Sequence, residues 1–112
     1  MTVWKRSWSK LAWNKAYGMI GMAMKAGKLV SGEFATEKAV KSGKAALVIV
    51  SESASENTKK KFRNMCGYYQ VPICFFGEKE ELGHAIGKQF RASLAVTDEG
   101  LAKAIKKNLI HE

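Results

Sequence analysis

The sequence has little proline and no linker-like stretch. Pro72 is its single proline, and no serine- and glycine-rich run divides its 112 residues. We therefore expect one domain over residues 1–112, with residues 1–8 as a loose, basic, tryptophan-bearing extension. No apolar run approaches the roughly 20 residues that a bilayer requires, and the N-terminus lacks the apolar segment of a signal peptide. These absences predict no membrane partner.

Cysteine is also scarce. Cys66 and Cys74 are the only two, and each has apolar neighbours. Their spacing matches neither a CxxC pair nor a zinc ligand set. We expect two buried thiols in a reducing compartment, and hence a cytoplasmic protein with no metal and no cofactor. A disulfide or redox pair is the alternative.

Sequence motifs of catalysis and nucleotide binding are missing as well. The chain contains no GxxxxGK loop, no GxGxxG and no GxSxG. Glu80 and Glu81 are adjacent, so on a helix their side chains diverge by about 100°. Glu33 and Glu37 do share a face, but carboxylates early in a helix are explained by its dipole. We expect no catalytic residue, no small-molecule substrate and no enzyme.

Acidic residues are absent before Glu33, whereas basic residues are plentiful. The chain carries 19 Lys and Arg against 10 Asp and Glu, a formal charge of +9. Two further basic blocks occupy residues 59–63 and 103–107. An excess of this size predicts an anionic partner, and nucleic acid is the first candidate. Either block alone is equally typical of a solvated helix face.

Apolar periodicity alternates between helical and strand-like along the chain. Helices are predicted over residues 9–25, 33–41, from Ser55 onward, over 79–86, and from Thr97 or Asp98 onward. Strands are predicted over residues 28–31, 46–50, 73–76 and 93–96. The two central strands have no polar face, so both faces of the sheet must be covered. The predicted fold class is α/β: a three-layer α/β/α sandwich with a mixed sheet of about four strands.

Residues 25–43, KAGKLVSGEFATEKAVKSG, hold the strongest candidate site. A lysine-bearing strand ends at Gly32, and a helix begins at once, with free N–H groups that suit a phosphate. Phe34, Lys38 and Lys41 share one helix face, so the ring could stack on a base while the lysines meet phosphates. Equally, Phe34 could belong to the core. The candidate contacts are Lys28, Ser31, Gly32, Glu33, Phe34, Lys38 and Lys41.

From Ala16 to Ile105 the chain resembles the ribosomal protein L7Ae/L30e family, and within it the bacterial YlxQ-like branch. The resemblance rests on the segments GKLVSGEFATEKAVKSGKAALVIV, SASENTKKKF and VPICFFGEKEELGHAIGKQFRASLAVTDEGLAKAI. It implies the α/β/α fold and non-catalytic binding of structured RNA, either kink-turn-like or ribosomal. It also implies the ribosome or ribosomal proteins as further partners.

The resemblance implies an RNA contact at the start of the second helix. The family pattern there is Gly, a small polar residue, Asn, Glu, two more residues and Lys. Gly32 and Lys38 match its ends, whereas Phe34 and Ala35 hold the Asn and Glu positions. Neither residue can make the hydrogen bonds with which Asn and Glu read sheared guanine–adenine pairs. Binding should therefore be less specific for kink-turns, or directed to a different RNA.

Two more loops are implied as contacts. In the loop after the fourth helix, Gly87, Lys88, Phe90 and Arg91 would stack on an unpaired base and meet phosphate. In the loop after the second strand, Glu52 matches a carboxylate that family members often place there. We expect the helix start and the loop after the fourth helix to converge on one edge of the sandwich.

The N-terminal tryptophans indicate an alternative function. Trp4, Trp8 and Trp13 lie in the basic N-terminal segment. Trp13 fits a helix core, but the other two could anchor a protein partner, which would make the chain a protein-interaction or ribosome-assembly module. The same rings could stack on RNA.

Overall fold

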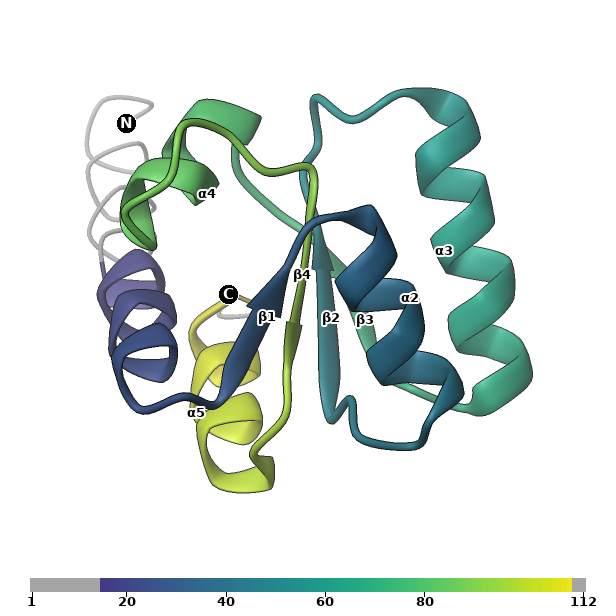
Figure 1. The fold of residues 1–112 in the computed structure, drawn as a ribbon, viewed down its shortest axis with the longest axis horizontal. Helices are drawn as coiled ribbons and strands as arrows, with labels where there is room; N and C mark the ends of the chain where they lie inside the picture. The colour runs from purple at the N-terminus through teal and green to yellow at the C-terminus, as the bar shows by residue number, and fades with distance from the viewer. Residues whose placement is uncertain (1–14, 110–112) are drawn as a thin grey trace, which may run out of the picture.

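The computed structural model describes residues 15–109. Residues 15–25 are helical, and we refer to them as the N-terminal helix. The elements that follow are β1 (Leu29–Ser31), α2 (Glu33–Lys41), β2 (Leu47–Val50), α3 (Glu56–Tyr69), β3 (Ile73–Phe75), α4 (Lys79–Ala85), β4 (Ser93–Val96) and α5 (Glu99–Leu109) (Figure 1). The predicted helices and strands are confirmed. Where both ends of an element were predicted and lie within the described residues, each end differs from the prediction by at most one residue. The predicted helix start near Ser9 and the three tryptophans lie outside the described residues.

The four strands form one mixed sheet in the order β1-β4-β2-β3. β2 and β3 are parallel, whereas β4 is antiparallel to both of its neighbours. Ser31 pairs with Leu94, and Val50 pairs with Ser93 on one side and with Phe75 on the other. Consequently β1, β2 and β3 all finish where β4 starts. We call this end of the sheet, at the top in Figure 1, the loop end.

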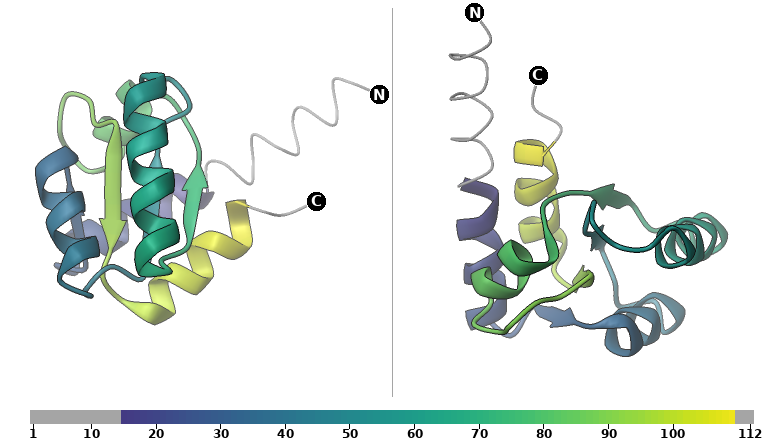
Figure 2. Two further views of the ribbon diagram at one scale, coloured as in Figure 1. Left: turned by 90° about the vertical axis from the view of Figure 1, so that its right-hand side faces the viewer. Right: turned by 90° about the horizontal axis from the view of Figure 1, so that it is seen from above.

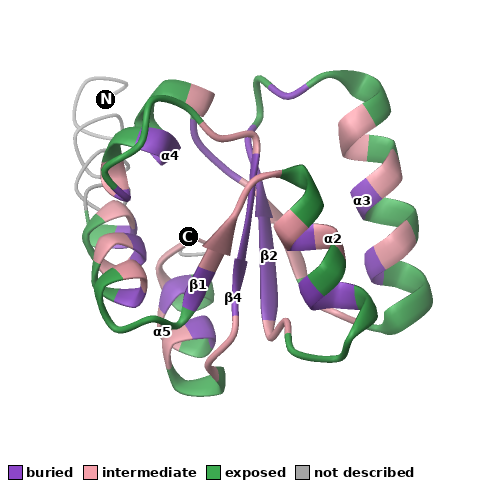
Figure 3. Cartoon of the chain, in the orientation of Figure 1, coloured by how far each residue is buried: buried purple, intermediate pink, exposed green. Residues whose placement is uncertain are grey.

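Helices cover both faces of the sheet, which confirms the three-layer sandwich. The N-terminal helix, α4 and α5 lie on one face, and α2 and α3 lie on the other (Figure 2). Leu47 and Ile49 belong to the first core, whereas Val48 and Val50 belong to the second. All four side chains are buried (Figure 3). This alternation explains the unbroken apolar run, because successive strand residues point to opposite faces and both faces are covered here.

The α3 helix begins as predicted, and of the apolar stripe that helical spacing predicts, Thr58, Phe62, Met65 and Tyr69, only Tyr69 is exposed. Ser55 Oγ accepts a hydrogen bond from the Thr58 N–H at 3.1 Å, which is an N-cap. Phe62 and Cys66 are the buried residues of the helix. The prediction that Tyr69 continues the buried stripe is wrong, since its ring is exposed and stacks edge-on against Tyr68. Val71, in the link to β3, packs against that core instead.

The cysteine prediction is confirmed for Cys66 and corrected for Cys74. Both are free thiols, but Cys66 is buried whereas Cys74, on β3 of the sheet, is half-buried. Burial raises the pKa of the Cys66 thiol to about 11 and also raises that of Cys74. Both thiols therefore stay protonated near neutral pH and are poor nucleophiles. Over residues 15–109, no three His, Cys, Asp or Glu side chains gather as metal ligands, and no helix could cross a membrane.

Candidate nucleic-acid interface

Three of the segments that the sequence singles out meet at the loop end. The Gly32 N–H donates to the Ser93 carbonyl at 2.9 Å, and the Ser51 N–H donates to the Ala92 carbonyl at 2.8 Å. The Glu52 N–H donates to the Gly77 carbonyl at 2.9 Å. The start of α2, the loop after β2 and the loop after α4 are thus joined through the ends of the strands. The structure brings these segments together, with the Glu52 side chain exposed beside them.

Arg91 joins the loop after α4 to the end of β1. Its Nε donates to Ser31 Oγ at 3.0 Å, and its Nη1 donates to the Phe90 carbonyl at 2.8 Å. Its backbone N–H donates to the Lys79 carbonyl at 3.0 Å. The guanidinium has five N–H groups, so the side chain retains three donors that could reach a phosphate. Arg91 therefore holds the loop in place as well as carrying charge.

The first turn of α2 offers unoccupied donors beside an exposed ring. Gly32 precedes the helix with φ 96°, a conformation that favours glycine, and no side chain caps the helix. The first N–H groups and the helix dipole there suit an anion. Phe34 is 80% exposed, which excludes the alternative that it belongs to the core. Its ring lines a hollow on α2 together with Lys38 and Lys41, so the three side chains share one helix face as predicted.

An ion-pair network runs from α2 to α3. Lys61 Nζ lies 2.8 Å from a carboxylate oxygen of both Glu33 and Glu37, and Lys41 Nζ lies 2.8 Å from the other oxygen of Glu37. Hydrogen bonds from Lys41 and then Lys61 lower the pKa of Glu37 to about 2. Lys38 makes no ion pair within residues 15–109 and is free to meet an external anion. The shared face of the two glutamates was visible in the sequence, but their partner on α3 was not.

Two of the candidate residues lie away from the loop end. Lys28 precedes β1, and at about 3.3 Å per residue it is roughly 10 Å along the chain from Ser31. Lys41 ends α2, about 12 Å along the helix axis from Glu33 at 1.5 Å per residue. Both are exposed, but only Lys28 is separate from the other candidates, since Lys41 lines the same hollow as Phe34 and Lys38.

Gly83 in α4 is a residue that sequence reasoning missed. It is buried, and a Cβ there would lie 2.4 Å from the Cα and 2.7 Å from the N of Phe90. The backbone of the loop after α4 therefore lies directly on this glycine, and the Lys88 N–H donates to its carbonyl at 2.8 Å. The Phe90 side chain is 56% exposed.

Gly83→Ala is expected to lower the free energy of unfolding by about 1–3 kcal/mol, since the added methyl group would displace loop backbone. Urea denaturation measures the change. Gly18→Ala is the matched control, because nothing lies within 4 Å of a Cβ at that helical position. It should stabilise the protein by about 0.5–1 kcal/mol through helix propensity. Equal stability of Gly83→Ala and the parent would contradict the close packing.

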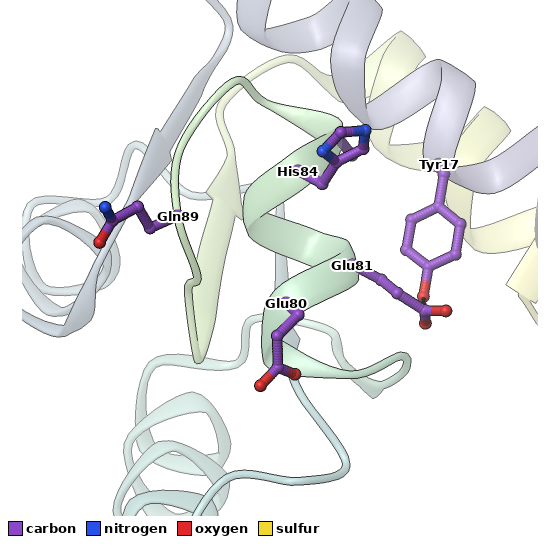
Figure 4. A pocket seen from close by; sticks show the side chains of 6 residues that line it. Tyr17, Glu80, Glu81, His84 and Gln89 are labelled. Atoms are coloured by element: carbon purple, nitrogen blue, oxygen red, sulfur yellow. Dashed lines mark hydrogen bonds between the residues drawn. The ribbon is translucent and has the colours of Figure 1, made fainter.

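The outer side of α4 carries titratable groups but no catalytic arrangement. Tyr17, Glu80, Glu81, His84, Ala85 and Gln89 line a hollow there (Figure 4). Tyr17 Oη donates to Glu81 Oε1 at 2.6 Å, and burial together with that carboxylate raises the pKa of the phenol. Glu80 points away from Glu81, as their adjacency predicted.

The architecture and these loops define a class: small three-layer α/β/α domains that present basic and aromatic loops at one end of a mixed sheet. The chain belongs to the ribosomal protein L7Ae/L30e/S12e/Gadd45 family, whose model matches residues 14–106. The predicted family and its YlxQ-like branch are confirmed. These relationships also confirm the prediction that the chain is not an enzyme.

Two relatives and two solved structures document the match. RNA-binding protein YlxQ of Bacillus subtilis is 40% identical over 89 residues, covering 80% of this chain and 89% of the relative. RNA-binding protein YlxQ of Enterococcus faecium is 42% identical over 93 residues, covering 83% and 89%. A protein of unknown function from Bacillus halodurans C superimposes with TM-score 0.82 at 38% identity, covering 85% and 96%. The Giardia lamblia 15.5kD RNA binding protein shares the fold, with TM-score 0.71 at 21% identity over 83% and 80% of the chains.

Proposed function

We propose that the chain binds structured RNA, kink-turn-like or ribosomal, at the loop end of its sheet. The observation that carries the proposal is the pair of exposed rings, Phe34 and Phe90, on segments that the sheet holds together, beside Lys38, which makes no ion pair within residues 15–109. Two exposed rings that flank one set of joined loops form a surface on which unpaired bases can stack. The names of the two YlxQ relatives support the same class of ligand.

Each part of the surface would have a separate role. Phosphates would meet the free N–H groups at the start of α2, the Lys38 ammonium and the remaining donors of Arg91. Bases would stack on the two phenylalanine rings, and the exposed Glu52 carboxylate could accept a hydrogen bond from an exocyclic amino group. The formal charge of +9 would add long-range attraction.

The departures from the family pattern bear on which RNA is chosen. A phenylalanine ring stacks on any base, since every base has a π-face, and Ala35 offers no hydrogen bond. Recognition would then depend on RNA shape and on the presence of unpaired bases more than on base identity. Under this proposal, a kink-turn is bound for its bent backbone and displaced bases.

The test is the salt dependence of binding to a kink-turn hairpin and to a fully paired hairpin of equal length. For the kink-turn hairpin, log affinity should fall linearly with log salt, and Lys38→Ala should reduce the slope by about 0.7–0.9, the value of one phosphate contact. Lys107→Ala on α5, away from the loop end, is the charge-matched control and should leave the slope unchanged. Absence of binding to either hairpin, or binding insensitive to salt, would refute the proposal.

A further inference from the structure

A second hollow lies between α4 and the N-terminal helix, next to the first hollow, with which it shares Tyr17 and Ala85. Its volume is about 480 Å³, within the roughly 300–1,000 Å³ typical of sites for small ligands. The two helices pack closely beside it, because a Cβ on Gly21 would lie only 2.9 Å from the Ala85 carbonyl oxygen. The residues that matter for what it could hold are Gly18, Gly21, Met22, Lys25, Ala85 and Gly87.

The charges of the two hollows beside α4 differ in sign. The hollow in Figure 4 is lined by the carboxylates of Glu80 and Glu81 and should repel a phosphate. The second hollow has no carboxylate among its lining residues, and Lys25 contributes a cation. Within the described part of the chain, Lys25 makes no ion pair. Of these two hollows, the second is therefore the one that suits a polyanion.

The second hollow is also continuous with the proposed interface. Gly87 is both part of its wall and the first residue of the loop that carries Lys88 and Phe90. Met22, which also lines the hollow, is 62% exposed, so its thioether is accessible to a ligand.

We propose that this hollow binds one unpaired nucleotide of the same RNA, adjacent to the part held at the loop end. The inference rests on the proposed function and extends it to a neighbouring site. The base would lie against the Met22 thioether, which makes favourable contacts with aromatic rings, and against the backbone at Gly18. The phosphate would lie near the Lys25 and Lys88 ammonium groups.

The geometry provides a variant that fills the hollow without disturbing the fold. A Cβ on Gly18 has nothing within 4 Å, so Gly18→Leu should place its side chain in the hollow. Gly18→Ala is the matched control, because it gains the same helix propensity but leaves most of the space open. Urea denaturation of both variants should show stability at or above that of the parent.

The experiment compares a kink-turn hairpin with blunt ends and the same hairpin carrying three unpaired nucleotides on its 5′ end or on its 3′ end. We expect an extension at one end to increase affinity about fivefold to tenfold for the parent and for Gly18→Ala. Gly18→Leu should bind the blunt hairpin like the parent and lose the gain from the extension. Lys25→Gln should lose part of it.

The remaining outcomes overturn the inference in distinguishable ways. If the blunt hairpin binds but neither extension adds affinity, the hollow does not hold a nucleotide. If Gly18→Leu keeps the gain, the extension binds elsewhere and the hollow does not hold the nucleotide. If the blunt hairpin itself does not bind, the proposed function fails, and the inference fails with it.

Discussion

Replacing Phe62 by alanine is expected to lower the free energy of unfolding by about 3–5 kcal/mol, a large part of the stability of a domain this size. The ring is fully buried and packs in the core between α3, α2 and the sheet. Its removal leaves a cavity as well as a loss of buried apolar area. Chemical denaturation monitored by circular dichroism measures the change.

Phe34→Ala is the natural comparison for that experiment, because it removes the same atoms from a ring that is 80% exposed. The expected change is within about 0.5 kcal/mol, as for most surface substitutions. A loss from Phe34→Ala comparable to that from Phe62→Ala would show that Phe34 is packed, and the surface assigned to RNA would have to be redrawn.

The double substitution of Phe34 and Phe90 by alanine is expected to weaken RNA binding at least 30-fold. Stacking of one base on an aromatic side chain contributes about 1–3 kcal/mol, so two rings contribute about 2–6 kcal/mol. Fluorescence anisotropy with a labelled kink-turn hairpin at a fixed salt concentration gives the ratio of dissociation constants. Both rings are largely exposed, so the variant should remain folded.

Tyr68→Ala is the control for the double substitution. Tyr68 is also 80% exposed, but it lies in the last turn of α3, at the opposite end of the sandwich from the loop end. We expect less than a twofold change in affinity. If Tyr68→Ala weakens binding as much as the double substitution, the RNA covers the α3 end of the molecule and the assignment to the loop end is wrong.

The fold could be predicted because its determinants are local. The apolar runs at β2 and β3 could be covered only by helices on both faces of the sheet. Glycines at residues 27, 32 and 43 mark the boundaries of helices. The strand order could not be predicted, because it depends on which strands pair across long separations. The exposure of Tyr69 was missed for the same reason, since helical spacing does not show which residue of another segment completes a core.

The candidate site could be predicted in outline but not in its connections. Helical spacing placed Phe34 and Lys38 on one face, but it could not decide between core and surface. The attachment of Arg91 to Ser31 spans 60 positions, and the contacts of Lys61 with Glu33 span 28. Gly83 gave no signal, because the sequence does not show that the loop backbone at Phe90 folds back onto it, and it looks like any other helical glycine.

The hydrogen bonds of Gly32, Ser51 and Arg91 have a consequence for the ligand. Segments held to neighbouring strands in this way have little freedom to remodel around a partner. Under the proposed function, it is therefore the RNA, and not the protein, that must change its conformation on binding. The apparent dissociation constant then equals the intrinsic one divided by the fraction of RNA already in the receptive shape. Magnesium ions or base changes that alter this fraction would tune binding as strongly as substitutions in the protein.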